Sequence, residues 1–491
     1  MLEKDLLAIV LDKALEKGGD FAEVYVEEKR TSNVLCEDDK IEKINSGREK
    51  GAGIRVVKDG KTAYVYTNDL TAEGLLKAAT VANHAPFGYH RCSMAVANNV
   101  ATGSKDRTGG MVINLSLQKP DFEMQFRRLP EQVDFAEKIE QVLAANHVAR
   151  NMDAEIRQVT VALGDMHKQV QIANSEGELV EDELARVRLV VNAIASRDGQ
   201  IQTGYEVAGA VSGWELLEEV SVEEMAGKAA SRAIAMLSAR PAPTGRMPVV
   251  MHADAGGTMI HEACGHGLEA DLVQKGLSVY ANKMGEQVAM EEVNVIDDAT
   301  LLRKYGSFRW DDEGSPARRT VLIEKGVLRG YLYDRMTARK DGTESSGNGR
   351  RESYQDKPIP RMSNTFISPG PDEPDEIIKS TPRGLLVKKM GGGQVNTTNG
   401  DFVFDVQEGY IIEDGEIMYP VRGATLTGNG PRALIDIDRV GKDLGFAIGV
   451  CGKDGQGVAV ADAQPTIRIK ELTVGGTFSG EGPGIKRIRR K

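Results

Sequence analysis

The sequence predicts an α+β fold, in which a mixed α/β N-terminal domain (residues 1–240) precedes a mostly β C-terminal domain (246–491). Three observations lead to this prediction. The 491 residues exceed what one typical hydrophobic core accommodates. Helical and alternating apolar patterns are interspersed before residue 240, whereas short strand patterns separated by glycine dominate afterwards. The segment Pro241-Ala242-Pro243-Thr244-Gly245 lies between the two regions and interrupts both patterns.

The N-terminal region alternates between helices and strands. Its first helix is expected over 3–17, where apolar residues recur among charged ones, and Gly18-Gly19 ends it. Ser221 and Glu224 form a capping box that begins another helix, which runs to about Leu237. Further helices are expected at 71–83 and 130–149, and strands near 21–28, 31–36, 41–45, 52–58, 62–66, 154–163, 167–173, 184–195 and 200–211. Residues 86–120 show no clear periodicity, and we expect an irregular insertion there.

The C-terminal region contains one convincing helix, which is expected over 257–272. The rest of this region is typical of short strands with glycine between them. The expected strands lie at 248–251, 319–324, 330–333, 385–389, 402–406, 410–413, 447–450 and 466–474.

Composition and charge exclude several classes of function. The net charge of −11 opposes binding to a phosphate backbone, so we expect no nucleic-acid partner, and the basic segment 486–491 is interpreted as a solvated chain end. No window reaches the roughly 18 apolar residues of a membrane helix, and the amphipathic N-terminus is not typical of a secretion signal. The four cysteines are too scattered for a disulfide framework. These features predict a cytoplasmic protein without a membrane partner.

The clearest chemical pattern is His261-Glu262-Ala263-Cys264-Gly265-His266. Its spacing, His-Glu-x-x-x-His, is one residue longer than the His-Glu-x-x-His pattern of zinc proteases. In a regular α-helix, positions five apart diverge by about 140° around the axis. The two imidazoles can therefore share one ion only if an i→i+5 bulge, which Gly265 favours, brings them to one face. On this condition the helix at 257–272 is the metal-binding helix of the C-terminal domain.

A third ligand is expected from elsewhere, because catalytic zinc usually has three protein ligands and a water. Cys451 is the candidate, since it ends a predicted strand and a thiolate binds zinc well. Glu262 would activate the zinc-bound water by taking its proton. The zinc ion, His252 or Tyr354 could stabilise the oxyanion, and the sequence selects none of them.

Each of these residues also has a plainer interpretation. The His-Glu-x-x-x-His pattern is short enough to arise by chance, and an isolated cysteine such as Cys451 is more often a core residue. Cys264 is interpreted as buried and apolar, although it could be a rival ligand. Glu269 could orient His266 or be a solvated helix charge. The segment Asn348-Gly349-Arg350-Arg351 is interpreted as a loop with solvated arginines, although it could bind a carboxylate.

Taken together, the ordered motifs resemble those of the TldD subunits of the TldD/PmbA (TldD/TldE) metalloprotease family of bacteria and archaea. The similarity is densest from about 245 to 477, and the N-terminal pattern agrees more loosely. Residues 86–120 show no pattern of the family. The matching segments are His261–Glu269, Ser346–Arg351, Arg361–Thr365, Gly391–Val395, Gly400–Phe402, Pro420–Thr425 and Cys451–Gln456.

The resemblance implies that His261, His266 and Cys451 hold Zn²⁺ and that Glu262 is the catalytic base, with no other cofactor. It implies hydrolysis of peptide bonds in unfolded or peptide substrates inside a TldD/TldE-type assembly. The implied partner is a PmbA/TldE-type subunit in a heterodimer, although a homodimer is also open. The alternative is a non-enzymatic peptide-binding scaffold with a structural metal site. Glu262 favours the enzyme, because closed structural zinc sites have four protein ligands and do not need a neighbouring free carboxylate.

Overall fold

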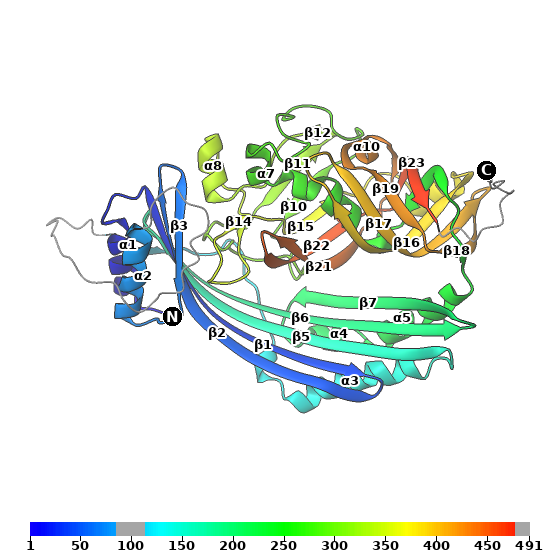
Figure 1. Cartoon of the computed structure of the whole chain (residues 1–491), viewed down its shortest axis with the longest axis horizontal. Coiled ribbons are helices and arrows are strands. Elements are labelled where there is room, and N and C mark those ends of the chain that lie inside the picture. The colour runs from blue at the N-terminus through cyan, green and yellow to red at the C-terminus, as the bar shows by residue number, and fades with distance from the viewer. Residues whose placement is uncertain (85–112, 477–491) are drawn as a thin grey trace, which may run out of the picture.

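The structure, a computed structural model, describes residues 1–84 and 113–476. Residues 1–84 and 113–240, here called the N-terminal half, contain one long curved sheet that lies against the strand-rich C-terminal half, residues 246–476 (Figure 1). Both helices and strands contribute to the fold, which is α+β as the sequence predicts. The division into two domains at 241–245 stays a prediction.

The N-terminal sheet has the spatial order β3-β2-β1-β5-β6, with β7 and the short β4 both paired to β6. Its strands are β1 (Phe21–Glu37), β2 (Lys40–Lys58), β3 (Lys61–Thr67), β4 (Ser116–Leu117), β5 (Ile156–Asn174), β6 (Glu178–Arg197) and β7 (Gln200–Val211). The expected strands at 21–28 and 31–36 are joined in β1, and those at 154–163 and 167–173 are joined in β5. The apolar alternation fades at the joins because charged pairs occupy the sheet surface there, as Lys29 does with Glu49 and Asp165 with Lys138.

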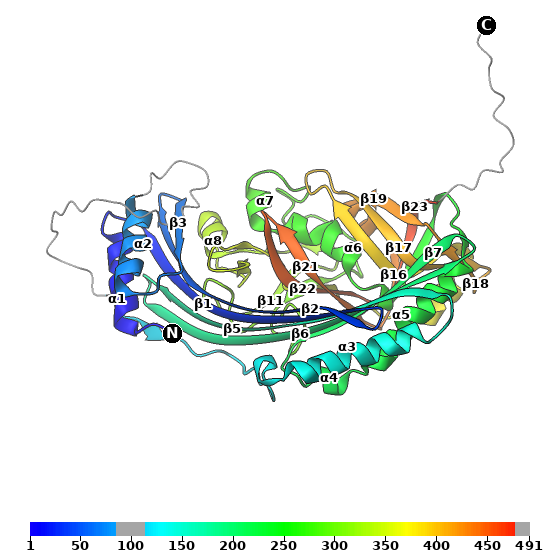
Figure 2. The ribbon, with the colours of Figure 1, turned by 60° about the horizontal axis from the view of Figure 1, so that its bottom comes forward.

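Helices cover this sheet in two places. α1 (Lys4–Leu15) and α2 (Ala72–His84) pack on one end, and α3 (Phe135–Arg150) and α5 (Val222–Leu237) pack on the face turned away from the C-terminal half (Figure 2). The predicted cap of α5 is confirmed, since Ser221 Oγ accepts the Glu224 N–H at 3.1 Å. The remaining short helices of this half are α4 (Leu216–Glu219) and a 3-10 turn at Pro130–Gln132.

The C-terminal half contains two main sheets around one large core. One has the order β12-β11-β10-β15-β22-β21, and the other has the order β16-β9-β23-β19-β17-β18-β8, with β16 also paired to β17 so that it closes on itself. The strands are β8 (Arg240–Pro241), β9 (Gly245–Met251), β10 (Val295–Asp298), β11 (Arg319–Glu324), β12 (Val327–Leu328), β13 (Gly349–Arg350), β14 (Ile359–Pro360), β15 (Asn364–Ile367), β16 (Arg383–Val395), β17 (Asp401–Glu413), β18 (Glu416–Arg422), β19 (Thr425–Asn429), β20 (Ile437–Val440), β21 (Gly445–Lys453), β22 (Gln456–Gln464) and β23 (Ile467–Gly475). Short helices join them: α6 (Thr258–Ile260), α7 (Ala270–Gln274), α8 (Arg335–Asp341), α9 (Pro374–Lys379) and α10 (Gly430–Ile435).

Two sequence expectations fall wholly or partly outside the described residues. Of the irregular insertion expected at 86–120, residues 113–120 are described and include β4, which pairs with β6. The basic segment 486–491 is not among the described residues. Within residues 1–84 and 113–476, no helix combines the length and the apolar character that crossing a membrane requires.

Buried charges join the two halves. Arg351 Nη2 lies 2.5 Å from Glu23 Oε1 on β1, and Arg55 Nη2 on β2 lies 2.8 Å from Glu23 Oε2 and 2.6 Å from Glu313 Oε1. All four side chains are almost completely buried. The interpretation of Arg351 as a solvated loop residue is therefore wrong, and its alternative, binding of a carboxylate, is what the structure shows. The Glu23 carboxylate gives Arg351 a buried countercharge. This ion pair replaces the stabilisation that water gives to an exposed guanidinium group.

Removal of the Glu23 charge is expected to weaken this junction. Glu23→Gln leaves Arg55 and Arg351 buried with less countercharge, so we expect the free energy of unfolding to fall by about 3–5 kcal/mol in denaturant titrations. Glu28→Gln on the same strand is the control, because Glu28 pairs with the exposed Arg48 and should cost less than about 1 kcal/mol. Equal losses in the two variants would contradict a stabilising role for the buried cluster.

Candidate metal centre

The chain changes its helical winding at the two candidate histidines. It begins as α6, forms a π-turn over His261–Gly265, and continues as a 3-10 turn over His266–Leu268 before α7. The His266 N–H donates to the His261 C=O, which is an i→i+5 hydrogen bond. The structure therefore contains the bulge that the His-Glu-x-x-x-His spacing requires. The continuous helix expected over 257–272 is broken into short pieces for the same reason.

Close packing explains why this segment is rich in glycine. A Cβ atom on Gly265 would lie 2.2 Å from Met362 Sδ, and one on Gly257 would lie 2.2 Å from the backbone nitrogen of Ala463. The π-turn is therefore pressed against the chain just before β15, and the start of α6 is pressed against β22. The Tyr280 hydroxyl donates to the Ala263 carbonyl at 2.9 Å and provides a partner for a backbone group within the π-turn.

Gly265→Ala is expected to disturb the π-turn. The added methyl group must displace the Met362 side chain, and overpacking of this kind costs about 1–3 kcal/mol. Thermal unfolding should show the loss, and metal content should fall with it. Gly452→Ala is a matched control next to Cys451, because its Cβ meets no atom within 4 Å. The explanation fails if both variants unfold like the wild type.

The structure brings His261, His266 and Cys451 together, although Cys451 and His266 lie 185 residues apart in the sequence. One potential ligand atom from each residue lies within 4.8 Å of the other two. Cys451 Sγ is 3.4 Å from His266 Nε2, and the two imidazole rings meet edge-on with centroids 4.9 Å apart. His261 and Cys451 are 7% and 5% exposed. These atoms are close enough to bind a single ion.

Buried arginines hold the hairpin that carries Cys451. On this hairpin Cys451 of β21 lies opposite Val458 of β22. Arg361 donates to the carbonyl oxygens of Cys451 at 2.5 Å and Gln456 at 3.3 Å. Arg350 donates to the carbonyl of Ala459 on β22 at 2.8 Å. The arginines thus fix the thiol through its backbone.

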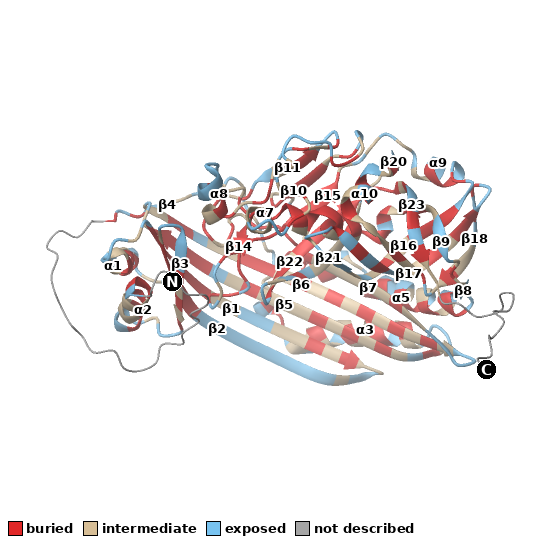
Figure 3. Ribbon diagram, turned by 45° about the horizontal axis from the view of Figure 1, so that its top comes forward, coloured by how far each residue is buried: buried red, intermediate tan, exposed pale blue. Residues whose placement is uncertain are grey.

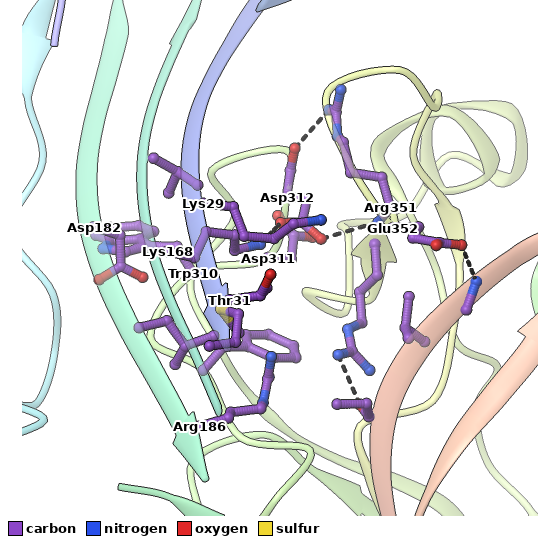
Figure 4. Close-up of a pocket in the computed structure, with 18 residues that line it drawn as sticks. Lys29, Thr31, Lys168, Asp182, Arg186, Trp310, Asp311, Asp312, Arg351 and Glu352 are labelled. Carbon is purple, nitrogen blue, oxygen red and sulfur yellow. Dashed lines mark hydrogen bonds and ion pairs between the residues drawn. The ribbon is translucent and has the colours of Figure 1, made fainter. Parts of the chain in front are cut away.

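Arg350 also contributes to the wall of a cavity of about 250 Å³ between the N-terminal sheet and the C-terminal half (Figure 4). Residues of β22 contribute to its wall, and none of His261, His266 and Cys451 lines it. Arg186 from the N-terminal half and Asp312 and Arg351 from the C-terminal half line it, as Figure 4 shows. The cavity is therefore a feature of the junction between the halves, distinct from the candidate metal centre.

A carboxylate lies beside each imidazole, and the one beside His266 is within hydrogen-bond distance. Glu269 Oε2 is 3.1 Å from His266 Nδ1 and 3.1 Å from Lys453 Nζ, and its side chain is fully buried. Asp462 Oδ1 lies 3.8 Å from His261 Nδ1. A hydrogen bond to one ring nitrogen leaves the other available to a metal and fixes the ring orientation. Of the two interpretations of Glu269 drawn from the sequence, the structure favours the one in which Glu269 orients His266.

The local charges favour the ligand form of Cys451. Burial opposes ionisation of the thiol, but hydrogen bonds and charge from His261 and His266 lower its pKa to about 5. Burial likewise opposes ionisation of Glu269, yet Lys453, His266 and Arg361 lower its pKa to about 2. Cys451 is therefore a thiolate at neutral pH, which is the form that binds metals.

Glu262 lies beside the cluster on the π-turn and is half-buried. Burial raises the pKa of its carboxyl group, and the neighbouring His261 and His266 only partly offset that effect. A carboxylate whose pKa moves toward neutrality is better suited to accept and return a proton. Its position and its protonation behaviour both fit a general base.

Three other residues considered from the sequence lie elsewhere. Cys264 is fully buried in the C-terminal core, and its Sγ lies 3.5 Å from the Ile260 carbonyl, to which it donates. Tyr354 packs with Tyr25 of the N-terminal sheet. His252 caps a short turn, where its Nδ1 accepts the Asp254 N–H at 3.2 Å. Cys264 is therefore a core residue, as its apolar interpretation held.

The sequence reasoning missed Lys453, Arg361 and Asp462 as parts of this site. A signal existed for Lys453, because it follows Cys451 by two residues on the same strand and so shares its face. Asp462 reaches the site through the pairing of β22 with β21 and β15, and Arg361 lies in the short link between β14 and β15; a single sequence specifies neither placement.

Models of three consecutive family domains match the chain. They are described as PmbA/TldA metallopeptidase domain 1 (residues 22–85), central domain (128–237) and C-terminal domain (244–476). The chain belongs to the TldD/PmbA metallopeptidase family. The C-terminal family domain contains all three members of the candidate metal cluster together with Glu262.

Relatives within the family match the chain over nearly its whole length. A protein named "Metalloprotease" from Methanothermobacter thermautotrophicus is 37% identical over 97% of this chain and 100% of its own. A "Metalloprotease TldD homolog" from Haemophilus influenzae is 34% identical over 97% of each chain. The similarity to TldD-named members confirms the family resemblance drawn from the sequence motifs.

Solved structures with the same fold are more distant in sequence. A putative modulator of a DNA gyrase from Thermotoga maritima superimposes with a TM-score of 0.78 at 24% identity, covering 96% of this chain and 100% of its own. TldE from Thermococcus kodakarensis gives 0.74 at 20% identity, over 96% and 100% of the two chains. At these identities the likeness concerns the fold of the family alone.

Proposed function

We propose that this chain is a zinc-dependent protease that hydrolyses peptide bonds in unfolded or peptide substrates. The observation that carries the proposal is the convergence of His261, His266 and Cys451 on one point beside Glu262. Two imidazoles and a thiolate are a donor set that zinc binds, and the His261 Nδ1 atom is buried without a hydrogen-bond partner among the described residues. The metalloprotease names of the full-length relatives support the same activity.

The proposed roles follow from this arrangement. His261, His266 and Cys451 would hold the zinc, which as a Lewis acid would supply stabilisation of negative charge near the scissile carbonyl. Glu262 accepts a proton from the attacking water and returns it to the leaving amine, which its raised pKa favours. Three protein ligands leave one position open, as in catalytic rather than structural zinc sites.

Metal analysis combined with a cleavage assay tests this function. The purified chain, alone and mixed with a PmbA/TldE-type subunit, should contain one zinc ion and cleave a permanently unfolded polypeptide but not its folded counterpart. Zinc without cleavage in either preparation would favour the non-enzymatic scaffold. Absence of zinc after incubation with the metal would overturn the proposal.

We further propose that the chain works with a second subunit of the same fold, either a PmbA/TldE-type subunit or a second copy. The similarity to the TldE structure supports this only as far as a shared fold. A cytoplasmic location stays a prediction from the sequence.

Glu269→Gln is expected to weaken zinc binding about 10–100-fold, because the amide no longer offers His266 a charged hydrogen-bond acceptor. Competition with a chromogenic chelator measures the affinity without reference to activity. Asp254→Asn is the control, since its side chain is 75% exposed. An unchanged affinity for the Glu269 variant would remove its assigned role in positioning His266.

A further inference from the structure

Two arginines without a carboxylate partner line the cavity of about 250 Å³ between the two halves. Arg186 belongs to β6 of the N-terminal sheet, and Arg350, which is 5% exposed, belongs to β13 of the C-terminal half. Among the described residues, neither guanidinium group has a carboxylate within ion-pair distance. The rings of Tyr305 and Phe308 lie against them and offset only part of the cost of burying a charge. The cavity wall therefore contains positive charge that the described chain does not neutralise.

Hydrogen bonds fix both guanidinium groups without using all of their N–H groups. Arg186 donates from Nε and Nη2 to two backbone carbonyls of the loop between β10 and β11, at 2.9 and 3.4 Å. Arg350 donates from Nη1 and Nη2 to the carbonyls of Met362 and Ala459, at 2.5 and 2.8 Å. Arg186 Nη1 and Arg350 Nε have no hydrogen-bond partner among the described residues, and neither atom is completely enclosed. These two nitrogens are left to donate to an acceptor in the cavity.

The two positive charges also repel each other. Burial and the neighbouring Arg186 lower the pKa of the Arg350 guanidinium to about 9, and burial lowers the pKa of Arg186 as well. An anion bound between the two groups offsets this repulsion and favours the charged form of both. Guanidinium groups present a planar fork of N–H donors that fits the oxygens of a phosphate or a carboxylate. The cavity thus has the donors and the charge of an oxyanion site.

The other basic side chains of the cavity already have carboxylate partners. Each lies within salt-bridge distance of an acidic residue, so its charge is compensated inside the chain. The pairs are Lys29 with Glu49 at 2.9 Å, Lys168 with Asp312 at 3.1 Å and Arg351 with Glu23 at 2.5 Å. An anion in the cavity therefore gains most from Arg186 and Arg350.

The acidic side chains of the cavity besides Asp312 have partners of their own. Asp182 accepts a hydrogen bond from Arg309 Nε at 2.7 Å. Asp311 accepts three backbone N–H groups at 2.8–3.0 Å, and burial raises its pKa well above the usual range. Glu352 is exposed, and its Oε2 accepts a backbone N–H of β22 at 2.6 Å. An anion at the two arginines thus meets little opposing charge.

A small solute can reach the cavity. Thr31 and Glu352, which also line it, are exposed. From residue 185 to residue 196 of β6, buried and partly buried residues alternate, which Figure 3 shows as red and tan bands, and Arg186 is one of the partly buried residues. The volume is below the roughly 300–1,000 Å³ of pockets for drug-sized ligands, so the occupant must be small.

We propose that this cavity binds a small oxyanion with two negative charges, either phosphate or a dicarboxylate, between Arg186 and Arg350. The bound anion connects β6 of the N-terminal sheet with β13 of the C-terminal half. Because Arg350 also donates to Ala459 on β22, the anion contacts the arginine that supports the hairpin of Cys451. The inference does not depend on the metal chemistry, and its tests measure anion binding alone.

Calorimetric titration with inorganic phosphate and, separately, with succinate tests the proposal, with the ionic strength kept constant by sodium chloride. At least one of the two anions should bind the wild type and raise its Tm, and the tighter one identifies the kind of oxyanion. Arg186→Gln should weaken this binding by about tenfold or more, because a charge-assisted hydrogen bond is lost. Arg188→Gln is the control, since it removes the same charge from the same strand outside the cavity and should leave the affinity within a few-fold of the wild type. Failure of both anions to bind, or equal weakening by the two substitutions, would overturn the proposal.

Crystallography locates the anion without any substitution. This matters because Arg186→Gln also loses the hydrogen bonds to the loop between β10 and β11, and the variant could be less stable for that reason. Wild-type crystals soaked with the tighter of the two anions should show difference density between the guanidinium groups of Arg186 and Arg350. Density for the anion only at other sites would contradict the proposal, even where binding is measured in solution.

Discussion

Glu262→Gln is expected to lower kcat for peptide hydrolysis about 10²–10⁴-fold while the zinc content stays that of the wild type. The amide keeps the shape of the side chain but cannot accept the proton of the attacking water, and proton transfer by a placed side chain contributes a factor of this size. Glu262 is half-buried on the π-turn, so a base from solution does not readily take over its role in the variant. Steady-state kinetics with a fluorogenic unfolded peptide, combined with elemental analysis, measures both quantities.

Glu262 is assigned as the catalytic base only if its replacement lowers kcat and leaves the metal content unchanged. Glu292→Gln is the control, since Glu292 is exposed and should retain full activity. A Glu262 variant that retains wild-type kcat would show that another group accepts the proton. A variant that loses both zinc and activity would assign Glu262 to metal binding instead.

Cys451→Ala is expected to lose zinc binding almost completely. Removing a residue that orients a ligand costs about 10–100-fold in metal affinity, and removing a ligand itself should cost more than this. Zinc should also no longer raise the Tm of the variant, because a ligand stabilises a fold only when its concentration is comparable to or above its Kd. Chelator competition and thermal unfolding with and without zinc give the two measurements.

Cys264→Ala provides the matched control for this experiment. Cys264 is a buried cysteine in the same segment as the histidines, but its Sγ atom contacts a backbone carbonyl rather than the cluster. Its replacement should lower stability slightly and leave zinc affinity within a few-fold of the wild type. Similar zinc affinities for the Cys451 variant and the wild type would exclude Cys451 from the ligand set.

Local signals in the sequence predicted much of the fold. The capping residues before α5 and the glycines after α1 act over a few residues, so their effect can be recognised without knowledge of the tertiary structure. Strand length was less predictable, because β1 and β5 continue through segments where ion pairs replace apolar contacts. A continuous strand with polar side chains on both faces has no apolar alternation to identify it.

The candidate site shows the same limit of local information. The spacing of His261 and His266 required a bulge, and the structure contains one. Asp462 beside His261 and Arg361 behind Cys451 come from distant parts of the chain, and their positions depend on the folding of the whole C-terminal half. The role of the histidines and Cys451 as ligands stays a prediction that the variants above test.

The separation of His266 from Cys451 along the chain has a consequence during translation. A ribosome adds about 5–20 residues per second, so roughly 10–40 s pass between synthesis of the two proposed ligands, which are 185 residues apart. During that interval the nascent polypeptide has its histidines but lacks the thiolate and the hairpin that presents it. Proteolytic capacity would then arise only after most of the chain has left the exit tunnel, so that an incomplete product cannot digest itself or its neighbours on the same messenger RNA.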